Sequence, residues 1–244
     1  KIVTVVSDNP SRGLPLIHGH YLFCDRETGV PLATLDGSAL TALRTPAASA
    51  LATDVLARSD VRTLGIFGTG VQARGHIEAV LAVRPGIESV VVCGRTPESS
   101  ETFAAGVDAG GRTASAASAD EVAACDVVCG CTSAAEPVIP TAAVRPGTHV
   151  NLVGSYSTAR REVDDDLVAT TSVFVDDREA AAEESGELIH AASGSWSFDR
   201  IVGDLAELAS GRAGRRDNDE VTLFKSVGLA VEDVVVAAAV VARS

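Results

Sequence analysis

A glycine-rich turn is the first place in the chain where residue types and spacing predict chemistry. It reads Gly68-Thr69-Gly70-Val71-Gln72-Ala73, which fits the pattern Gly-x-Gly-x-x-Gly/Ala between an apolar run and a helix-forming segment. The first glycine permits a tight turn, the second lets backbone approach a pyrophosphate, and the small Ala73 lets the helix pack on the strand. Free N–H groups at the helix start attract phosphate. The turn predicts dinucleotide binding; the alternative is a strand-to-helix turn that binds nothing.

The residues after the next apolar run indicate which dinucleotide would bind. That run, residues 90–93, leads into Gly94-Arg95-Thr96, where an NAD enzyme usually has an Asp or Glu to hold the ribose 2′-hydroxyl. Arg95 is instead a planar cation that suits a 2′-phosphate, and Thr96 adds a hydroxyl. We therefore expect NADP(H) to be preferred, with NAD(H) possible. In the other interpretation, Arg95 is a surface side chain that stacks on the adenine.

The segments around the turn alternate between short apolar strands and helices. This alternation predicts a parallel sheet with helices on both faces, as in a Rossmann domain. Residues 1–58 lack the alternation and predict strands, a hairpin turn and one Ala- and Leu-rich helix. The predicted strands are 63–67, 89–93, 126–130, 148–153 and 172–175, and the helices between them are 70–83, 97–105 and 119–124.

Composition excludes several classes of protein. The 244 residues are 46% apolar and carry a formal net charge of -13. An acidic surface argues against nucleic acid and anionic membranes as partners, because both require a cationic patch, and no apolar run reaches the roughly 18 residues of a membrane helix. The five cysteines predict free thiols in a reducing cytoplasm, and their spacing does not predict zinc. Because the chain starts at Lys1 inside a strand-like run and contains no Met, we expect a further N-terminal segment.

Several spaced motifs resemble those of the ornithine cyclodeaminase/mu-crystallin family, in the same order along the chain. The matching segments are 1–4, 36–45, 63–79, 151–154 with 161–162, and 222–233. The resemblance implies an α/β fold in which the Rossmann domain is inserted into a smaller α+β domain that binds substrate and forms a homodimer. The expected boundaries are 1–58 for the first part of the smaller domain, 59–216 for the Rossmann domain, and 217–244 for a C-terminal segment that returns to the smaller domain.

The resemblance also implies roles for individual residues. Lys1 matches the active-site lysine of the family, and Arg44 matches the arginine that holds the substrate carboxylate. Both charges suit a carboxylate, since an arginine fork binds it in a bidentate way and a lysine adds a point charge. The implied contacts to the nicotinamide half of the cofactor are Thr132, Val153, Ser155 and Ser226.

Tyr156 departs from the pattern of the ornithine cyclodeaminases. At this position they carry an Asp that acts in deprotonation, whereas a phenol with a pKa near 10 is a poor base at neutral pH. We expect Tyr156 to line the substrate pocket, or else to be a packed loop aromatic. Imine reduction needs less from the protein, because a protonated C=N carbon is already electrophilic.

The sequence therefore predicts an NADPH-dependent reductase of small cyclic imino acids, such as Δ1-pyrroline-2-carboxylate or Δ1-piperideine-2-carboxylate. The alternatives are an ornithine or lysine cyclodeaminase, an alanine dehydrogenase-like enzyme, and a non-catalytic NADPH-binding carrier or sensor. The expected partners are a small imino or amino acid and a second copy of the chain. No metal is expected, because hydride transfer needs none.

Overall fold

The computed structural model describes residues 1–6, 8–15, 17–155 and 157–243, with only the backbone of Pro10. The chain forms two compact units, a smaller one of Lys1–Thr45 with Leu229–Ser244 and a larger one of Pro46–Gly228. Helix α1 (Gly37–Leu56) begins in the smaller unit and ends in the larger one. The domain boundaries expected from sequence stay a prediction; the compact units place residues 46–58 and 217–228 with the larger sheet.

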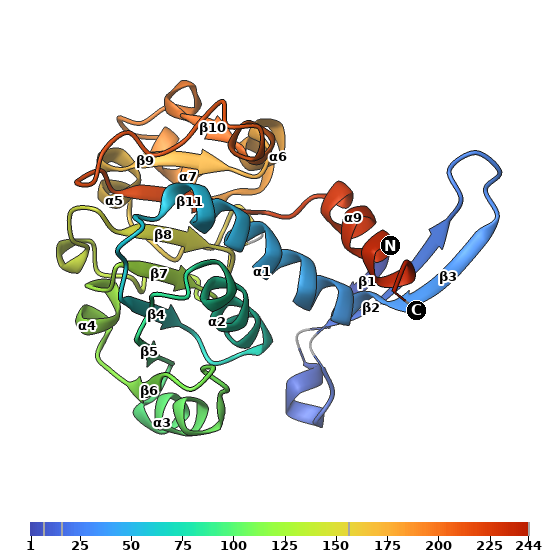
Figure 1. Ribbon diagram of the computed structural model, residues 1–244, viewed down its shortest axis with the longest axis horizontal. Coiled ribbons are helices and arrows are strands. Elements are labelled where there is room, and N and C mark those ends of the chain that lie inside the picture. The colour runs from blue at the N-terminus through green and yellow to red at the C-terminus, as the bar shows by residue number, and fades with distance from the viewer. Residues whose placement is uncertain (7, 16, 156, 244) are drawn as a thin grey trace. The chain divides into compact units, whose positions relative to one another are not determined.

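The larger unit is built on an eight-stranded sheet in which all the strand pairs are parallel (Figure 1). The strand order is β10-β9-β11-β8-β7-β4-β5-β6. The chain thus proceeds from β4 through β5 to β6 on one side and from β7 through β8 to β9 and β10 on the other, with the last strand, β11, between β8 and β9. Strands β4 and β7 therefore form the switch point where such sheets bind ligands. The strands are β4 Thr63–Phe67, β5 Ser89–Cys93, β6 Thr113–Ala116, β7 Val127–Gly130, β8 His149–Leu152, β9 Ser172–Val175, β10 Gly203–Asp204 and β11 Thr222–Lys225.

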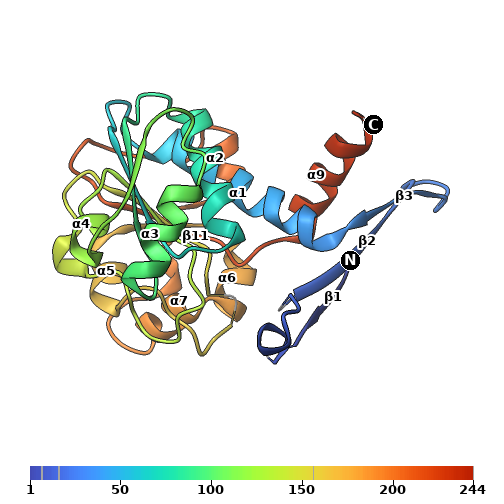
Figure 2. The same cartoon turned by 90° about the horizontal axis from the view of Figure 1, so that it is seen from below.

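Helices cover both faces of this sheet (Figures 1 and 2). Successive residues of β7 point to opposite faces: Val127 and Cys129 join an apolar cluster with α2 and α3, whereas Val128 joins one with α4, α5 and α7. The predicted α/β Rossmann fold is therefore confirmed. The helices are α2 Val71–Val83, α3 Pro97–Gly106, α4 Ala119–Ala123, α5 Asp165–Thr170, α6 Arg178–Glu184, α7 Gly186–Ala192 and α8 Leu205–Ala209.

The smaller unit contains an antiparallel sheet of order β1-β2-β3. Its strands are β1 Ile2–Val5, β2 Ile17–Cys24 and β3 Pro31–Asp36, and a small core of Tyr21, Leu40 and Ala237 joins β2 to α1 and to the C-terminal helix α9 (Ala230–Val241). Among the described residues, no helix combines the length and apolar character that crossing a bilayer requires.

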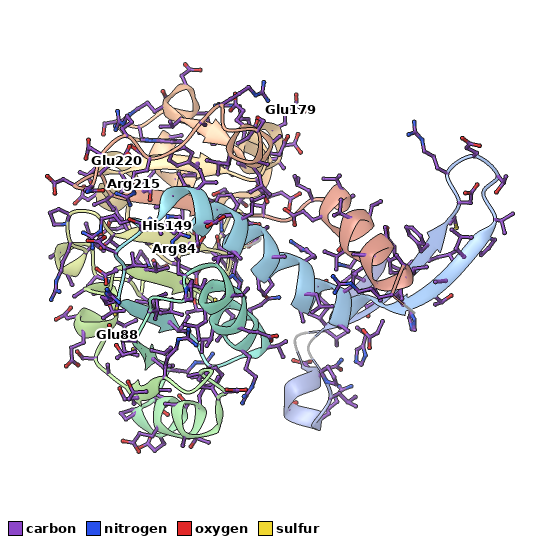
Figure 3. All side chains as sticks on the ribbon, in the orientation of Figure 1. Arg84, Glu88, His149, Glu179, Arg215 and Glu220 are labelled. Carbon is purple, nitrogen blue, oxygen red and sulfur yellow. The ribbon has the colours of Figure 1, made fainter. Side chains whose placement is uncertain are left out.

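Two fully buried histidines lie in the larger unit. His149 on β8 bonds to Thr222 and Asn151, and burial, with the charge of Arg215, lowers its pKa to about 3. Figure 3 shows His149 with Arg84 and Arg215 labelled nearby. His76 on α2 bonds to Ser49, and burial lowers its pKa to about 4. Both rings are therefore neutral in the folded protein at neutral pH.

We predict that these histidines make the fold sensitive to mild acid. Their folded pKa values lie below the unfolded value of about 6.5, so only the unfolded chain gains protons as the pH falls below 6.5. The stability that neutral burial contributes is complete above pH 6.5, and about 2 kcal/mol for each ring is lost by pH 5. In urea titrations, His149→Gln should flatten the decline in the free energy of unfolding between pH 6.5 and 5. His18→Gln, on an exposed position of β2, should not; an unchanged slope in the His149 variant would contradict the prediction.

Candidate active site

The glycine-rich turn links β4 to α2 with the geometry that the sequence predicts. Gly68 has a φ of +108°, and a Cβ there would lie 2.6 Å from the carbonyl oxygen of Cys131. Only glycine fits both the backbone angle and this close approach. Ala73 is fully buried against the sheet. Gly68 is therefore required by the turn, and the small Ala73 allows helix α2 to pack on the sheet.

Gly70 is the residue that a phosphate would meet. It is the N-cap of α2, has extended backbone and makes no side-chain cap hydrogen bond. A Cβ on Gly70 would meet nothing within 4 Å, so the space beside it is open, and Val71 is exposed. Because α2 starts without a side-chain cap, its first N–H groups and the positive end of its dipole suit an anionic ligand. These residues fit the pyrophosphate of a dinucleotide.

Arg95 and Thr96 follow β5, next to the turn. A Cβ on Gly94 would lie 2.7 Å from Thr69 Cγ2 and 2.6 Å from Ser99 Oγ, so the chain passes close to the turn here. Thr96 is the N-cap of α3, where its hydroxyl accepts a hydrogen bond from the Ser99 N–H at 3.2 Å. The exposed Arg95 makes no hydrogen bond or ion pair with any described residue. Arg95 is thus available to a ligand, while Thr96 already serves the helix.

Four residues were expected at the nicotinamide end of the cofactor. Thr132 follows β7, with its backbone nitrogen 3.5 Å from the position of a Cβ on Gly68, and Val153 follows β8, where its N–H donates to the carbonyl of Gly130. Both are partly exposed at the carboxyl ends of their strands. The side chains of Ser155 and Ser226 are instead buried, and the Ser226 hydroxyl donates to Asp176 at 3.0 Å. Any contact from these two serines would have to come from backbone.

A buried carboxylate that the sequence analysis did not select joins the loops after β7 and β8. Glu162 Oε1 accepts from the N–H and hydroxyl of Thr132, both at 2.8 Å, and Oε2 accepts from the Gly154 N–H at 2.8 Å. Burial raises the pKa of Glu162 above its ordinary value, while the charge of Lys225 and the Thr132 hydrogen bonds oppose the rise. Two of these contacts are backbone N–H groups, which can only donate, so the geometry favours the charged, accepting form of the carboxylate.

Lys1 and Arg44 come together in the smaller unit on a third residue, Asp233. Lys1 Nζ lies 3.0 Å from Asp233 Oδ1, and Arg44 Nε lies 3.8 Å from the same oxygen. Arg44 Nη1 also bonds Glu232 Oε2 at 2.9 Å, and Lys1 Nζ donates to Thr41 Oγ1 at 2.5 Å. The side chains of Lys1, Arg44 and Asp233 are only 16%, 14% and 10% exposed. Two cations are thus concentrated in a partly desolvated cluster, where charge-assisted hydrogen bonds are strong.

Arg44 retains capacity for a ligand. Its buried Nε atom has no hydrogen-bond partner among the described residues. A guanidinium presents five donors in a fixed fork, and a buried donor without a partner is costly unless a ligand or water satisfies it. The arrangement suits an incoming carboxylate.

The start of α1 explains how Arg44 is positioned. Asp36 accepts hydrogen bonds from the N–H groups of Ser38 and Ala39, which lowers its pKa. Gly37 follows, and a Cβ there would lie 2.8 Å from the backbone of Gly19 on β2. The Asp-Gly pair therefore fixes the helix start against the sheet, two turns before Arg44.

Glu232 and Asp233 were not predicted as site residues. Both lie in the first turn of α9, inside the segment 222–233 that carried the family resemblance, so the signal was present. Tyr156, expected to line the pocket, lies outside the described residues. Within the described part of the chain, no group of three His, Cys, Asp or Glu side chains is placed to hold a metal ion.

The parallel sheet with its glycine turn defines the class as a Rossmann-type dinucleotide-binding protein with a second, smaller unit. Comparison with known proteins identifies the family. The model of the ornithine cyclodeaminase/mu-crystallin family matches residues 1–244, and the chain belongs to this family.

Individual relatives agree with this assignment. The Δ1-pyrroline-2-carboxylate reductase of Bacillus cereus is 41% identical over 243 residues, which cover 97% of this chain and 74% of that protein. The structure of Thermococcus litoralis Δ1-pyrroline-2-carboxylate reductase in complex with NADH and L-proline matches with a TM-score of 0.94 and 38% identity, covering 99% of this chain and 76% of that one. An archaeal alanine dehydrogenase dimer with bound NAD matches with a TM-score of 0.93 and 31% identity, covering 98% and 75%.

Proposed function

We propose that this protein reduces small cyclic imino acids, with Δ1-pyrroline-2-carboxylate or its six-membered homologue as substrate and a nicotinamide dinucleotide as hydride donor. The observation that carries the proposal is the pair Lys1 and Arg44, two partly buried cations on Asp233, in which the buried Arg44 Nε has no hydrogen-bond partner among the described residues. A chain with this carboxylate-binding cluster and a dinucleotide-binding turn suits an α-imino acid. The identity to Δ1-pyrroline-2-carboxylate reductases supports this substrate class.

The bound cofactor would supply a hydride to the imine carbon, and the imine nitrogen gains a proton, so that a cyclic amino acid and oxidised cofactor result. The fork of Arg44 would hold the substrate carboxylate and fix the ring. Lys1 Nζ, held by Asp233 and Thr41, is the proton donor in the described cluster. A protonated imine is the better hydride acceptor, so the proton from Lys1 and the orientation by Arg44 both assist the hydride-transfer step.

The test is to follow oxidation of NADPH and NADH at 340 nm with each cyclic imine, beside an assay of ammonia release from ornithine or lysine with the oxidised cofactors and one with pyruvate and ammonia. We expect rapid imine reduction and little turnover in the other assays. Ammonia release without imine reduction would establish a cyclodeaminase instead, and turnover of pyruvate would establish an alanine dehydrogenase. Tight cofactor binding without any turnover would indicate a carrier or sensor.

The preference for NADP(H) over NAD(H) is a further part of the proposal. It is supported by the exposed Arg95, which has no partner within the described part of the chain, and by the lack of an acidic residue in Gly94-Arg95-Thr96, directly after β5. We predict that Arg95→Ala raises the KM for NADPH roughly 10-fold, the loss of about 1.4 kcal/mol from one charge-assisted contact, and leaves the KM for NADH nearly unchanged. Arg26→Ala, at an exposed hairpin position, is the control. Equal effects on both cofactors would mean that Arg95 stacks on the adenine rather than binding a phosphate.

We also propose that the chain forms a homodimer through its smaller unit and acts in the cytoplasm, where its cysteines, all free, stay reduced. All four residues of β1 are exposed, with Ile2 at 73%, and so many exposed apolar side chains in one small sheet are unusual for a free surface. Light scattering should give the mass of two chains. Ile2→Glu should lower it towards one chain, whereas Val202→Glu in the larger unit should not; a monomeric unmodified protein would contradict the proposal.

A further inference from the structure

A cluster of three ionisable side chains is buried at the carboxyl edge of the large sheet. Lys225, the last residue of β11, has a fully buried ammonium that donates to the carbonyl and the hydroxyl of Ser155, each at 2.7 Å, and lies 3.3 Å from Glu187 Oε2. Glu187 Oε1 accepts from the N–H of Glu162 at 3.0 Å, and Oε2 accepts from the Ser155 hydroxyl at 2.5 Å. Glu162, Glu187 and Lys225 therefore form one connected network inside the larger unit.

The charges of this network do not balance. The hydrogen bonds to Glu162 and Glu187 come from the N–H and hydroxyl of Thr132, the N–H of Gly154, the N–H of Glu162 and the hydroxyl of Ser155, and the ammonium of Lys225 forms an ion pair with Glu187. The Thr132 hydroxyl accepts from the Ala134 N–H and the Ser155 hydroxyl accepts from Lys225 Nζ, so each hydroxyl has its own proton left to donate to a carboxylate. This donor geometry favours the charged form of both carboxylates, against the burial that raises the pKa of Glu162, and Lys225 offsets only one of the two charges. Arg160 does not supply the missing positive charge. Its guanidinium donates to the carbonyl of Ser133 in an exposed contact, where solvent screens its charge.

The surplus charge lies directly behind the loops expected to meet the nicotinamide. Glu162 holds Thr132 after β7 and Gly154 after β8, and Thr132 is adjacent to the Gly68 turn. Glycines make room for the carboxylate, because a Cβ on Gly130 or Gly154 would lie 2.9 or 2.5 Å from a Glu162 oxygen. Burying an unbalanced charge is costly. A cationic group that binds at this edge of the sheet would therefore be stabilised by the surplus negative charge.

We propose that Glu162 and Glu187 are positioning residues whose uncompensated negative charge favours the oxidised, cationic form of the nicotinamide over the neutral reduced form, an inference that rests on the proposed function. Hydride donation converts a neutral dihydronicotinamide into a cation. A fixed negative charge behind the ring stabilises that product and the transition state leading to it. The network would thus act through the loops at Thr132 and Gly154 and would also add to the driving force for imine reduction.

The experiment compares the full chain with its Glu162→Gln and Glu187→Gln variants. For each protein, the dissociation constants of the oxidised and the reduced cofactor are measured, with NAD(H) or NADP(H), whichever binds. We expect each variant to weaken binding of the oxidised form roughly tenfold more than that of the reduced form, as removal of one unit charge from a low-dielectric site predicts. For a two-electron couple, a tenfold change raises the potential of the bound cofactor by about 30 mV. If Glu162→Gln does not fold, Glu187→Gln gives the same reading, because it removes the other of the two negative charges.

Two further variants separate charge from structure. Thr132→Val removes one hydrogen bond from Glu162 without changing any charge, so it should weaken both cofactor forms by the same factor. Glu220, labelled in Figure 3, is a buried carboxylate at the opposite, amino-terminal edge of the sheet, where it accepts from the Ser172 hydroxyl. Glu220→Gln should leave the ratio unchanged. An unaltered ratio in both Glu162→Gln and Glu187→Gln would overturn the inference while the proposed function stands. Failure of the unmodified chain to bind either form would overturn both.

Discussion

Replacement of Arg44 by alanine is expected to reduce kcat/KM for the cyclic imine roughly 10²- to 10³-fold. Loss of one member of a desolvated, hydrogen-bonded charge pair costs about 3–4 kcal/mol, and here the pair would be formed with the substrate carboxylate. The dissociation constant for the cofactor should stay the same, because the Gly68–Ala73 turn belongs to the other compact unit. Stopped-flow or steady-state kinetics with titrated imine, beside fluorescence titration of the reduced cofactor, measures both.

The conservative Arg44→Lys variant distinguishes recognition of a carboxylate from simple packing. A lysine keeps the charge but loses the planar fork, so we expect intermediate activity that recovers mainly at high substrate concentration. Because Arg44→Ala removes an ion pair from Glu232 and another from Asp233, some loss of folding stability is also expected and must be measured by urea unfolding. A variant that stays folded and retains full kcat/KM would show that the substrate binds elsewhere.

Local patterns explain what the sequence could predict. A strand followed by Gly68-Thr69-Gly70 and a helix is encoded within about fifteen neighbouring residues, and the buried parallel strands are continuous apolar runs. Strand β6 was not predicted because its sequence, Thr-Ala-Ser-Ala, contains no apolar run. It lies at the edge of the sheet, where a strand needs little burial. The family resemblance placed Lys1 and Arg44, although their spacing alone indicated nothing.

The sequence did not predict contacts between residues that lie far apart along the chain. Asp233 meets Lys1 across an interval of 232 positions, and Lys225 meets Ser155 across 70. Neither interval follows from a helical or strand period, because only the tertiary fold brings such side chains together. Burial of a lysine is likewise invisible in sequence: Lys225 ends an apolar strand and looks like a surface residue there, yet it is fully buried. Besides elements such as β6, the structure therefore adds the partners of the predicted site residues.

The two glycines of the turn make different contributions, and this difference supports a second large prediction. Gly70→Ala should leave the free energy of unfolding nearly unchanged, because its φ is -94° and a Cβ would meet nothing within 4 Å. The added methyl would occupy the open space where we expect the pyrophosphate, so cofactor affinity should fall roughly 10- to 100-fold, about 1.4–2.7 kcal/mol. Isothermal titration with the reduced cofactor and urea unfolding of the same preparation give the two quantities.

Gly68→Ala is the matched variant with the opposite pattern. Its φ of +108° is unfavourable for any side chain, and the new Cβ would lie 2.6 Å from the Cys131 carbonyl, so the turn must distort and stability should fall by about 2 kcal/mol or more. Cofactor binding should fall with it, since Thr132 follows Cys131 in the same displaced loop. If Gly70→Ala proved as destabilising as Gly68→Ala, the space beside Gly70 would not be open. If it bound the cofactor as tightly as the unmodified protein, the pyrophosphate would not approach this turn, because a methyl group cannot share that space with a phosphate.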